Sequence, residues 1–234
     1  MDNPLDDQNS IIQQLDQVST ISRCEYESTT KMLSEFFDRT TEIYGQAITG
    51  QLSDQDKQIV EFRLAWLVYI IGAAIGGRVS INSSDEHDAL DGDLIIKGPK
   101  FYKKFQILTL FLVLILMDVV NKRLESNNVA HRSQPIDLAI LQFFDQFRKI
   151  YIGDQVHRSS KAYLRMSERL NLQDESDILN VLVKKIITNL KCWGDDEVIL
   201  VSQVHLNTKL NIFSEKHFNY YPNWLLVMQL LENW

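Results

Sequence analysis

Two long segments of this chain carry apolar side chains around more than half of a helix circumference. They span residues 63–80 and 143–156 and read RLAWLVYIIGAAIGGRVS and FFDQFRKIYIGDQV. A helix that is apolar on so many sides is usually packed on several sides at once. Such packing suits stacked helices in an all-α array, so these two segments constrain the fold more than any other feature of the sequence.

Apolar residues recur three and four positions apart along most of the chain, which is the spacing of one helix face. The expected stripes are Ile12, Leu15, Val18; Met32, Leu33, Phe36, Phe37, Ile43, Tyr44; Val60, Leu64, Leu67, Ile71, Ile75; Ile136, Ile140, Phe144, Phe147, Tyr151; and Leu179, Leu182, Val183, Ile186, Leu190. With only 9 Gly and 4 Pro, many strands joined by tight turns are not expected. We predict an all-α fold, with HEAT-like helical repeats ahead of a compact bundle.

Several polar residues predict where helices begin and end. Ser53 and Asp56 have the spacing of a capping box, so a helix should begin near Asp54. Gln134-Pro135 should begin another, since proline suits the first helical position. A shorter helix is expected over residues 159–170, and Asp174 is expected to cap the helix that follows it.

Gly72 and Gly76 are four positions apart, so they share a helix face that lacks side chains. Another helix can approach closely there. The stretch is not GxGxxG and follows no strand pattern, so it does not indicate a dinucleotide site.

Charge and cysteine content narrow the possible partners. The formal net charge is −7 and there is no long basic run, so nucleic-acid binding is not expected. Cys24 and Cys192 lie in helical patterns and are expected to be reduced, partly buried thiols. The acidic N-terminus lacks the pattern of a secretory signal.

Residues 105–117 are apolar without a charge. As a helix they would extend about 20 Å, which is shorter than the ~30 Å hydrocarbon core of a bilayer. A buried helix is favoured over a membrane span.

The candidate binding residues form an acidic cluster between two expected helices. They are Asp85, Glu86, Asp88, Asp91 and Asp93. Counting back from Gly92, an EF-hand loop would end on Gly98 instead of a glutamate, so the calcium motif fails. The structural interpretation of these carboxylates is a solvated loop between helices. The functional interpretation is a surface that binds a basic partner.

No other residue pattern indicates catalysis, a cofactor or a metal. The five histidines are scattered and match no zinc spacing, and neither a GxSxG elbow nor a P-loop is present. A basic cluster of Arg148, Lys149, Arg158, Lys161, Arg165 and Arg169 is interpreted as a solvated face, with contact to phosphate or an acidic cargo as the alternative. The chain is not expected to be an enzyme.

Several long sequence segments resemble one protein family. Besides the two apolar segments, they are LDQVSTISRCEYE (residues 15–27), SSDEHDALDGDL (83–94) and KIITNLKCWG (185–194). They resemble the central repeats of the exportin-7 (Ran-binding protein 16) family, in the importin-β class of nuclear transport receptors. The resemblance implies a HEAT-like helical solenoid, an α-α superhelix, that binds the GTPase Ran in its GTP state, protein cargo and nucleoporins. It also implies a protein that shuttles between nucleus and cytoplasm.

The resemblance also divides the chain. HEAT-like repeats are expected over residues 1–96 and 117–204, separated by a non-family apolar insert at 97–116 and followed by a divergent tail at 205–234. Retained intron sequence or a gene-model error is our hypothesis for the insert and the tail. Ran binding in this family depends heavily on amino-terminal repeats that precede the matching sequence segments. A helical scaffold that has lost transport activity is therefore the alternative to an export receptor.

Overall fold

The structure is a computed structural model that describes residues 8–76, 112–126, 131–151 and 175–214. Its regular elements are the helices α1 (Gln8–Cys24), α2 (Tyr26–Ile48), α3 (Asp54–Gly76), α5 (Leu112–Glu125), α6 (Gln134–Tyr151), α8 (Glu175–Cys192) and α9 (Glu197–Ser214). No strand occurs in these ranges. The predicted all-α, helical-repeat class is confirmed.

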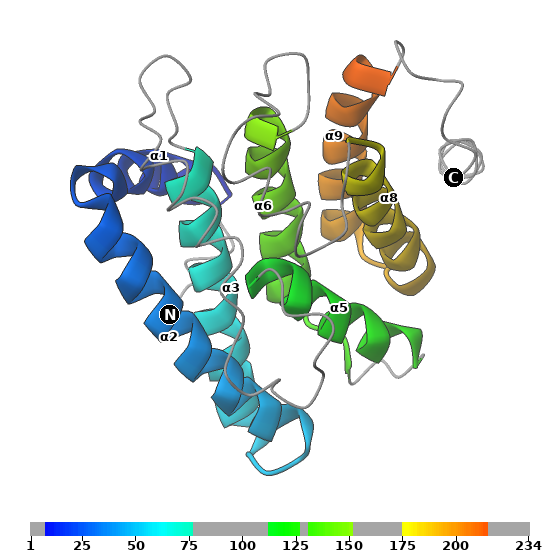
Figure 1. Ribbon diagram of the computed structural model, residues 1–234. Helices are drawn as coiled ribbons and strands as arrows, with labels where there is room; N and C mark the ends of the chain where they lie inside the picture. Colours follow the sequence, from blue (N-terminus) through cyan, green and yellow to red (C-terminus); the bar gives the residue numbers. More distant parts are fainter. Residues whose placement is uncertain (1–7, 77–111, 127–130, 152–174, 215–234) are drawn as a thin grey trace.

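Six of these helices form three stacked hairpins. The pairs are α2–α3, α5–α6 and α8–α9, and the second helices of the pairs stand side by side as one layer (Figure 1). The first helices form the other layer, in which α5 contacts α8. Helix α1 packs against α3 and α2. Each hairpin buries one side on the next, which is how helical repeats build a continuous core.

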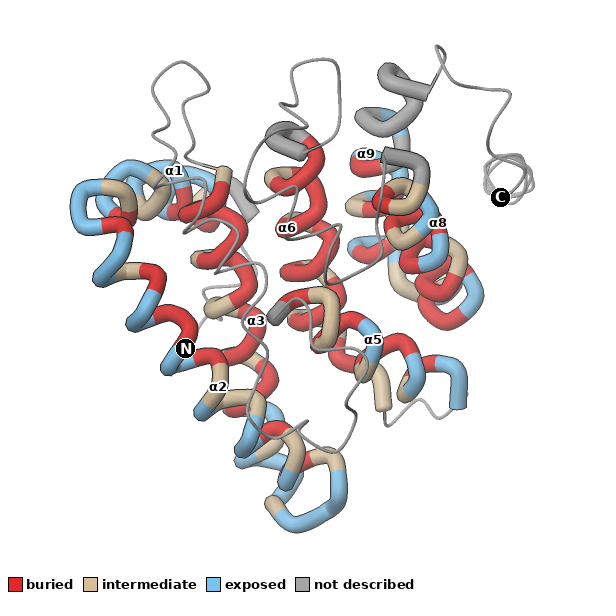
Figure 2. Tube along the Cα trace, in the orientation of Figure 1, coloured by how far each residue is buried: buried red, intermediate tan, exposed pale blue. Residues whose placement is uncertain are grey.

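Helix α3 lies at the centre of this core. It packs against α1, α2 and α6, and Leu64, Ala65, Val68 and Ile71 are completely buried. Figure 2 shows that most of its second half is buried. By length and hydropathy α3 is the one described helix that could cross a bilayer, but its apolar surface is mostly packed inside the protein. The side chains that made residues 63–80 so apolar are therefore core residues as far as Gly76.

Both ends of α3 have identifiable caps. The amide of Asp56 donates to Ser53 Oγ at 3.1 Å, which confirms the predicted cap. At the other end, the guanidinium of Arg23 donates to the carbonyl oxygens of Ala74 and Ile75, with N–O distances of 2.9 to 3.1 Å. Those carbonyls lie in the last turn of the helix, where a cation also complements the helix dipole.

The burial of α2 differs from the predicted stripe. Leu33, Phe37 and Tyr44 are buried, whereas Met32 and Phe36 are about half exposed and Ile43 is also exposed. The six residues span a wider arc of the helix circumference than one neighbouring helix can cover, so part of the stripe stays exposed. On α1, Ile12 and Ile21 are exposed and Cys24 is an exposed thiol, so the expectation that Cys24 is partly buried was wrong. Cys192 is buried.

The predicted starts of α3 and α6 agree with the structure. The helix expected at 159–170, the Asp174 cap and most of the expected insert at 97–116 lie outside the described residues. Helix α9 runs across residue 205, where we placed the start of the divergent tail. The division of the chain into family and non-family segments stays a prediction.

Candidate functional site

The acidic cluster predicted from sequence lies outside the described residues. Asp85, Glu86, Asp88, Asp91 and Asp93 belong to the connection between α3 and α5, which leaves the core at Gly76. Asp85 follows Gly76 by nine positions. The connection that carries the predicted site therefore begins at this end of α3.

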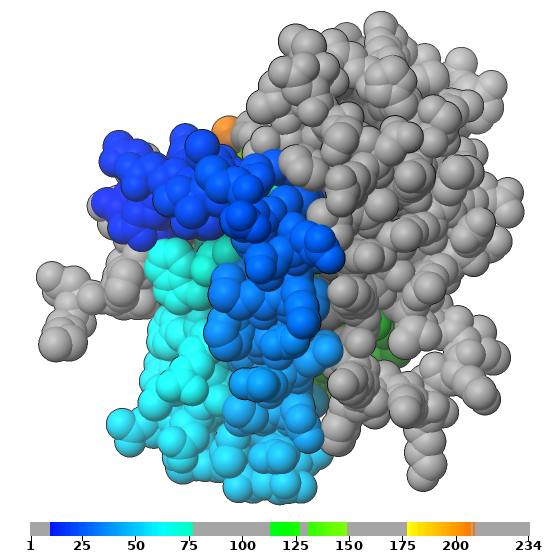
Figure 3. All heavy atoms as spheres, turned by 60° about the vertical axis from the view of Figure 1, so that its left-hand side comes forward, coloured from blue at the N-terminus to red at the C-terminus, as the bar shows by residue number. Residues whose placement is uncertain are grey.

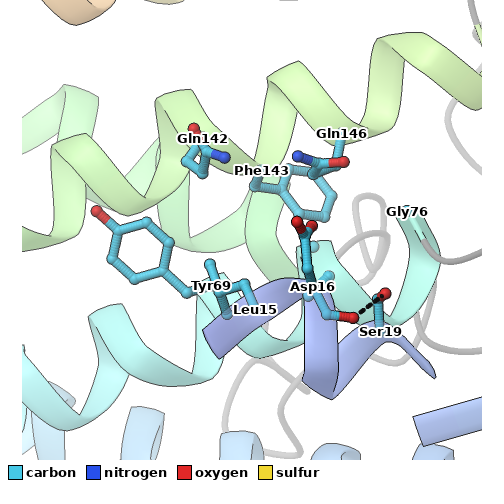
Figure 4. Close-up of a pocket in the computed structure, with 10 residues that line it drawn as sticks. Leu15, Asp16, Ser19, Tyr69, Gly76, Gln142, Phe143 and Gln146 are labelled. Carbon is cyan, nitrogen blue, oxygen red and sulfur yellow. Dashed lines mark hydrogen bonds between the residues drawn. The ribbon is translucent and has the colours of Figure 1, made fainter. Parts of the chain in front are cut away.

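A pocket opens at this end of α3, where α1 and α6 meet it. Ten residues line it: Leu15, Asp16 and Ser19 from α1; Tyr69, Gly72, Ala73 and Gly76 from α3; and Gln142, Phe143 and Gln146 from α6. Figure 4 shows the ring of Phe143 between the amide of Gln146 and the carboxylate of Asp16. The hydroxyl of Ser19 donates to the carbonyl oxygen of Asp16 at 2.7 Å. The polar lining residues, called the rim from here on, are Asp16, Ser19, Gln142 and Gln146.

The two glycines let α3 and α6 approach closely beside the pocket, and this close approach of a neighbouring helix was predicted from the sequence. A Cβ on Gly72 would lie 3.3 Å from the Cα of Phe143, and one on Gly76 would lie 2.7 Å from Oε1 of Gln146. A glycine in a helix costs about 1 kcal/mol relative to alanine. The close contact between the two helices accounts for tolerating that cost.

The size of the pocket limits what it holds. Its volume is about 60 Å³, whereas sites for drug-sized ligands or cofactors measure roughly 300–1,000 Å³. It has room for a few waters or for the end of one partner side chain. Within the described ranges, no three His, Cys, Asp or Glu side chains are grouped to hold a metal ion.

A buried polar network fixes the register of α5, α6 and α8 behind this surface. The Lys185 ammonium on α8 donates to Oδ1 of Asp137 on α6 and, at 3.0 Å, to Oδ1 of Asn121 on α5. The indole of Trp193 donates to the other Asp137 oxygen at 3.2 Å. Asp137 and Lys185 are at most 1% exposed. A pair buried this deeply is tolerated only when both charges are well hydrogen-bonded.

A second set of polar contacts joins the start of α6 to the turn between α8 and α9. Arg132 donates to both carboxylate oxygens of Asp195 at 2.8 and 3.0 Å, and its guanidinium lies 5.4 Å from the ring centre of Trp193. Asp196 accepts from Gln134 Nε2 at 2.7 Å and caps α9 by accepting from the amide of Ile199 at 3.0 Å. The last hairpin is therefore held to its neighbour by directional bonds.

Between α2 and α5, one polar contact bridges the layer. Arg123 donates to the hydroxyl of Tyr44 at 2.5 Å, and burial raises the pKa of Tyr44, so it stays protonated. Burial also raises the pKa of the Glu61 carboxyl, which is 8% exposed; Lys57, Ser133 and Arg123 oppose that shift. The Ser133 hydroxyl is close enough to act on Glu61 but forms no full hydrogen bond with it.

The interpretation of Arg148 as part of a solvated basic face was wrong. Arg148 is 8% exposed and pairs with Asp145 on its own helix at 3.1 Å. The salt bridge removes its charge from the surface. The side chains of the other members of the proposed basic cluster lie outside the described residues.

Sequence reasoning missed the pocket rim and the Asp137 network. A weak signal for the network was present, because Asp137 and Lys185 each interrupt an apolar stripe on a helix that is otherwise buried. A polar residue in such a position usually has a buried partner. The sequence does not say which partner, because Asp137 and Lys185 are 48 positions apart.

Comparison with known proteins gives one family. The model described as "Exportin-7-like, TPR domain" matches residues 1–215. Among curated relatives, the chain is 43% identical to Exportin-7-B of Xenopus laevis over 213 residues, 40% identical to Ran-binding protein 17 of Homo sapiens over 213, and 38% identical to Ran-binding protein 16 of Drosophila melanogaster over 220.

These alignments cover 91–94% of this chain but only 18% of each relative. The chain therefore spans about a fifth of the length of the curated proteins that it matches. No solved structure gives a significant match.

Proposed function

Because this chain belongs to the exportin-7 family of nuclear transport receptors, we propose that it acts as part of a nuclear export receptor. In this proposal it contributes helical repeats to a surface that binds Ran in the GTP state and protein cargo. It moves between nucleus and cytoplasm and contacts nucleoporins on the way. The family match over residues 1–215 is the observation that carries the proposal.

The described surface supports a binding function in place of a catalytic one. Its pocket, near the start of the α3–α5 connection, has a polar rim and takes a side chain but not a cofactor. A receptor of this kind needs no active site of its own, because the direction of transport comes from GTP hydrolysis on Ran. We accordingly propose that the chain is not an enzyme.

We place the partner contact at the acidic residues Asp85, Glu86, Asp88, Asp91 and Asp93, and we add Asp16 of the pocket rim as a further carboxylate. A cluster of carboxylates attracts a basic protein surface and speeds encounter, and salt weakens that attraction. A lysine or arginine of the partner would be the side chain that enters the rim.

The test is a binding assay with the chain immobilised and purified Ran offered in its GTP-locked and GDP forms. We expect retention of the GTP form alone. A variant with the five acidic residues reversed to lysine should bind more weakly, and its affinity should depend less on salt. An unchanged affinity and an unchanged salt dependence would remove the acidic contact.

The alternative function is a helical scaffold without transport activity. Under this alternative the isolated chain does not retain Ran–GTP, whereas a longer protein that contains the same repeats does. The same binding assay therefore separates the two functions.

A further inference from the structure

The pocket between α1, α3 and α6 carries one negative charge that has no partner within the protein. Asp16 is the only charged residue among the ten that line the pocket. In the described part of the chain, the Asp16 carboxylate takes part in no hydrogen bond or ion pair. The bonds that Ser19 and Thr20 donate to Asp16 end on its backbone carbonyl. A carboxylate in such a place attracts a cation and repels an anion.

Further hydrogen-bond acceptors face Asp16 across the pocket. Gln142 and Gln146 lie one turn apart on α6, so both amides belong to one face of that helix. In Figure 4 the Gln146 amide and the Asp16 carboxylate lie on opposite sides of the Phe143 ring. A ligand in the pocket therefore meets carboxylate oxygens from α1 and amide oxygens from α6. It has to donate hydrogen bonds in more than one direction.

The neighbouring end of α3 already holds a guanidinium of the protein itself. Arg23, further along α1 than Asp16, donates to the carbonyl oxygens of Ala74 and Ile75 at 2.9 to 3.1 Å. Its charge offsets the negative end of the α3 dipole. Among the described residues that line the pocket, the negative charge that remains is therefore that of Asp16.

The size of the pocket and the spread of its acceptors favour arginine over lysine. A volume of about 60 Å³ admits the end of one side chain. A guanidinium has five N–H donors in one plane, so two of them can bind both oxygens of Asp16 while another reaches a glutamine amide oxygen. A lysine ammonium is more strongly hydrated and acts as a point charge, so it gives up more water for fewer directed bonds.

We propose that the pocket is a subsite for one arginine side chain of a basic partner protein, with the guanidinium paired to the Asp16 carboxylate. Gly72, Ala73 and Gly76 of the lining leave room for the methylene stem of that arginine. This subsite depends on the proposed binding of a basic protein by the chain, and it adds which side chain is recognised. A partner with lysine at the same position binds more weakly.

NMR titration of the full chain tests the subsite, with N-acetyl-arginine methylamide as the probe and N-acetyl-lysine methylamide as the comparison at fixed ionic strength. We expect saturable shifts of the Gly72 and Gly76 amides, with a dissociation constant on the order of millimolar for arginine and at least about fivefold larger for lysine. Asp16→Asn should weaken arginine binding at least about fivefold. Asp54→Asn is the matched control, because it makes the same change at the exposed first residue of α3, at the far end of that helix.

Gly76→Ala separates the shape of the pocket from its charge. The new Cβ would lie 2.7 Å from Oε1 of Gln146, so it displaces the amide that lines the pocket while Asp16 stays in place. We expect weaker arginine binding in this variant as well. Binding that Gly76→Ala leaves unchanged would be attraction to an exposed carboxylate alone and would overturn the subsite. Equal binding of the two probes, unchanged binding by Asp16→Asn, or the lack of a saturable shift at the pocket would overturn it too.

Retention of Ran separates a failure of the subsite from a failure of the proposed function. Weaker retention of Ran–GTP by Asp16→Asn than by Asp54→Asn would support the subsite. Equal retention by both variants would overturn it and leave the proposed function in place. If neither the wild type nor a variant retains Ran–GTP while the arginine probe still binds through Asp16, the proposed function fails and the arginine site stands.

Discussion

The environment of the Glu61 carboxylate is unfavourable, because Glu61 is buried on α3 and its Oε1 has no hydrogen-bond partner. Burial raises the pKa of its carboxyl group. A group with a raised folded-state pKa holds its proton more tightly in the folded than in the unfolded chain. Ionised Glu61 therefore weakens the fold above the folded-state pKa. That penalty disappears as the pH falls to the unfolded value of about 4.3.

We accordingly expect Glu61→Gln to raise the free energy of unfolding at neutral pH, and the gain to shrink steadily towards pH ~4.3. Urea unfolding at several pH values measures this difference. The control is Glu42→Gln, because Glu42 is an exposed residue on α2. A gain that is the same at every pH, or that grows in acid, would contradict the burial argument.

Gly72 and Gly76 should respond differently to alanine. In Gly72→Ala the new Cβ meets the Phe143 Cα at 3.3 Å, so backbone has to move. In Gly76→Ala the shortest contact is with Oε1 of Gln146 at 2.7 Å, which can rotate away, and the Gln146 Cβ at 3.3 Å has to give only slightly. Alanine contributes up to ~1 kcal/mol of helix propensity at each site, and overpacking costs about 1–3 kcal/mol. We expect Gly72→Ala to destabilise and Gly76→Ala to be near neutral in thermal and urea unfolding. Equal effects would mean that α3 and α6 are less tightly packed than the structure indicates.

Between helices, the Asp137–Lys185 pair is the contact with the largest expected effect. Lys185→Met leaves the Asp137 carboxylate buried with only the Trp193 indole as a donor among the contacts described. Removing one partner of such a pair typically costs about 3–5 kcal/mol. We expect a loss of that size in urea unfolding.

The double variant Lys185→Met/Asp137→Leu should recover much of the loss, since it removes both charges. The exposed pair Asp118–Lys122 on α5, with an O–N distance of 2.6 Å, is the control. Lys122→Met should change stability by less than about 1 kcal/mol. Additive effects of the two buried substitutions would show that the charges do not interact in the folded protein.

The sequence predicted the individual helices better than it predicted which surfaces of those helices pack against one another. Local signals were sufficient for the starts of α3 and α6, because caps and prolines act within one turn. They were not sufficient to choose which half of the α2 stripe is buried, since Leu33 and Met32 are equally apolar and only the position of α3 distinguishes them. The pocket and the Lys185 network join residues from different hairpins. Such contacts follow from stacking, which no local pattern encodes.

On the scale of the whole molecule, helices α1 and α2 expose an apolar surface at the end of the stack opposite α9. Ile21 on α1 and Met32, Phe36 and Ile43 on α2 are 39–68% exposed. Figure 3 shows the outward surface of these two helices. An exposed apolar surface of this kind on a folded protein favours association.

Contact between two copies through this surface uses the same patch twice and closes as a dimer. We expect concentration-dependent dimerisation in light scattering. Phe36→Asp should shift the chain to monomer without a comparable loss of stability, because Phe36 is half exposed. The exposed polar substitution Glu35→Gln on the same helix is the control. A monomer at all concentrations would show that this surface is too small to hold two copies together.

The uneven distribution of polar bonds along the stack gives it unequal stiffness. The α5, α6 and α8 helices are joined by charges with strict geometry, whereas α2 and α5 share one Tyr44–Arg123 bond, and only Glu25 separates α1 from α2. The Arg23 bonds hold α1 to the end of α3, and the glycine contact holds α3 to α6. A bending force on the array would therefore be absorbed first between α2 and α5, with the α3–α6 contact as the pivot.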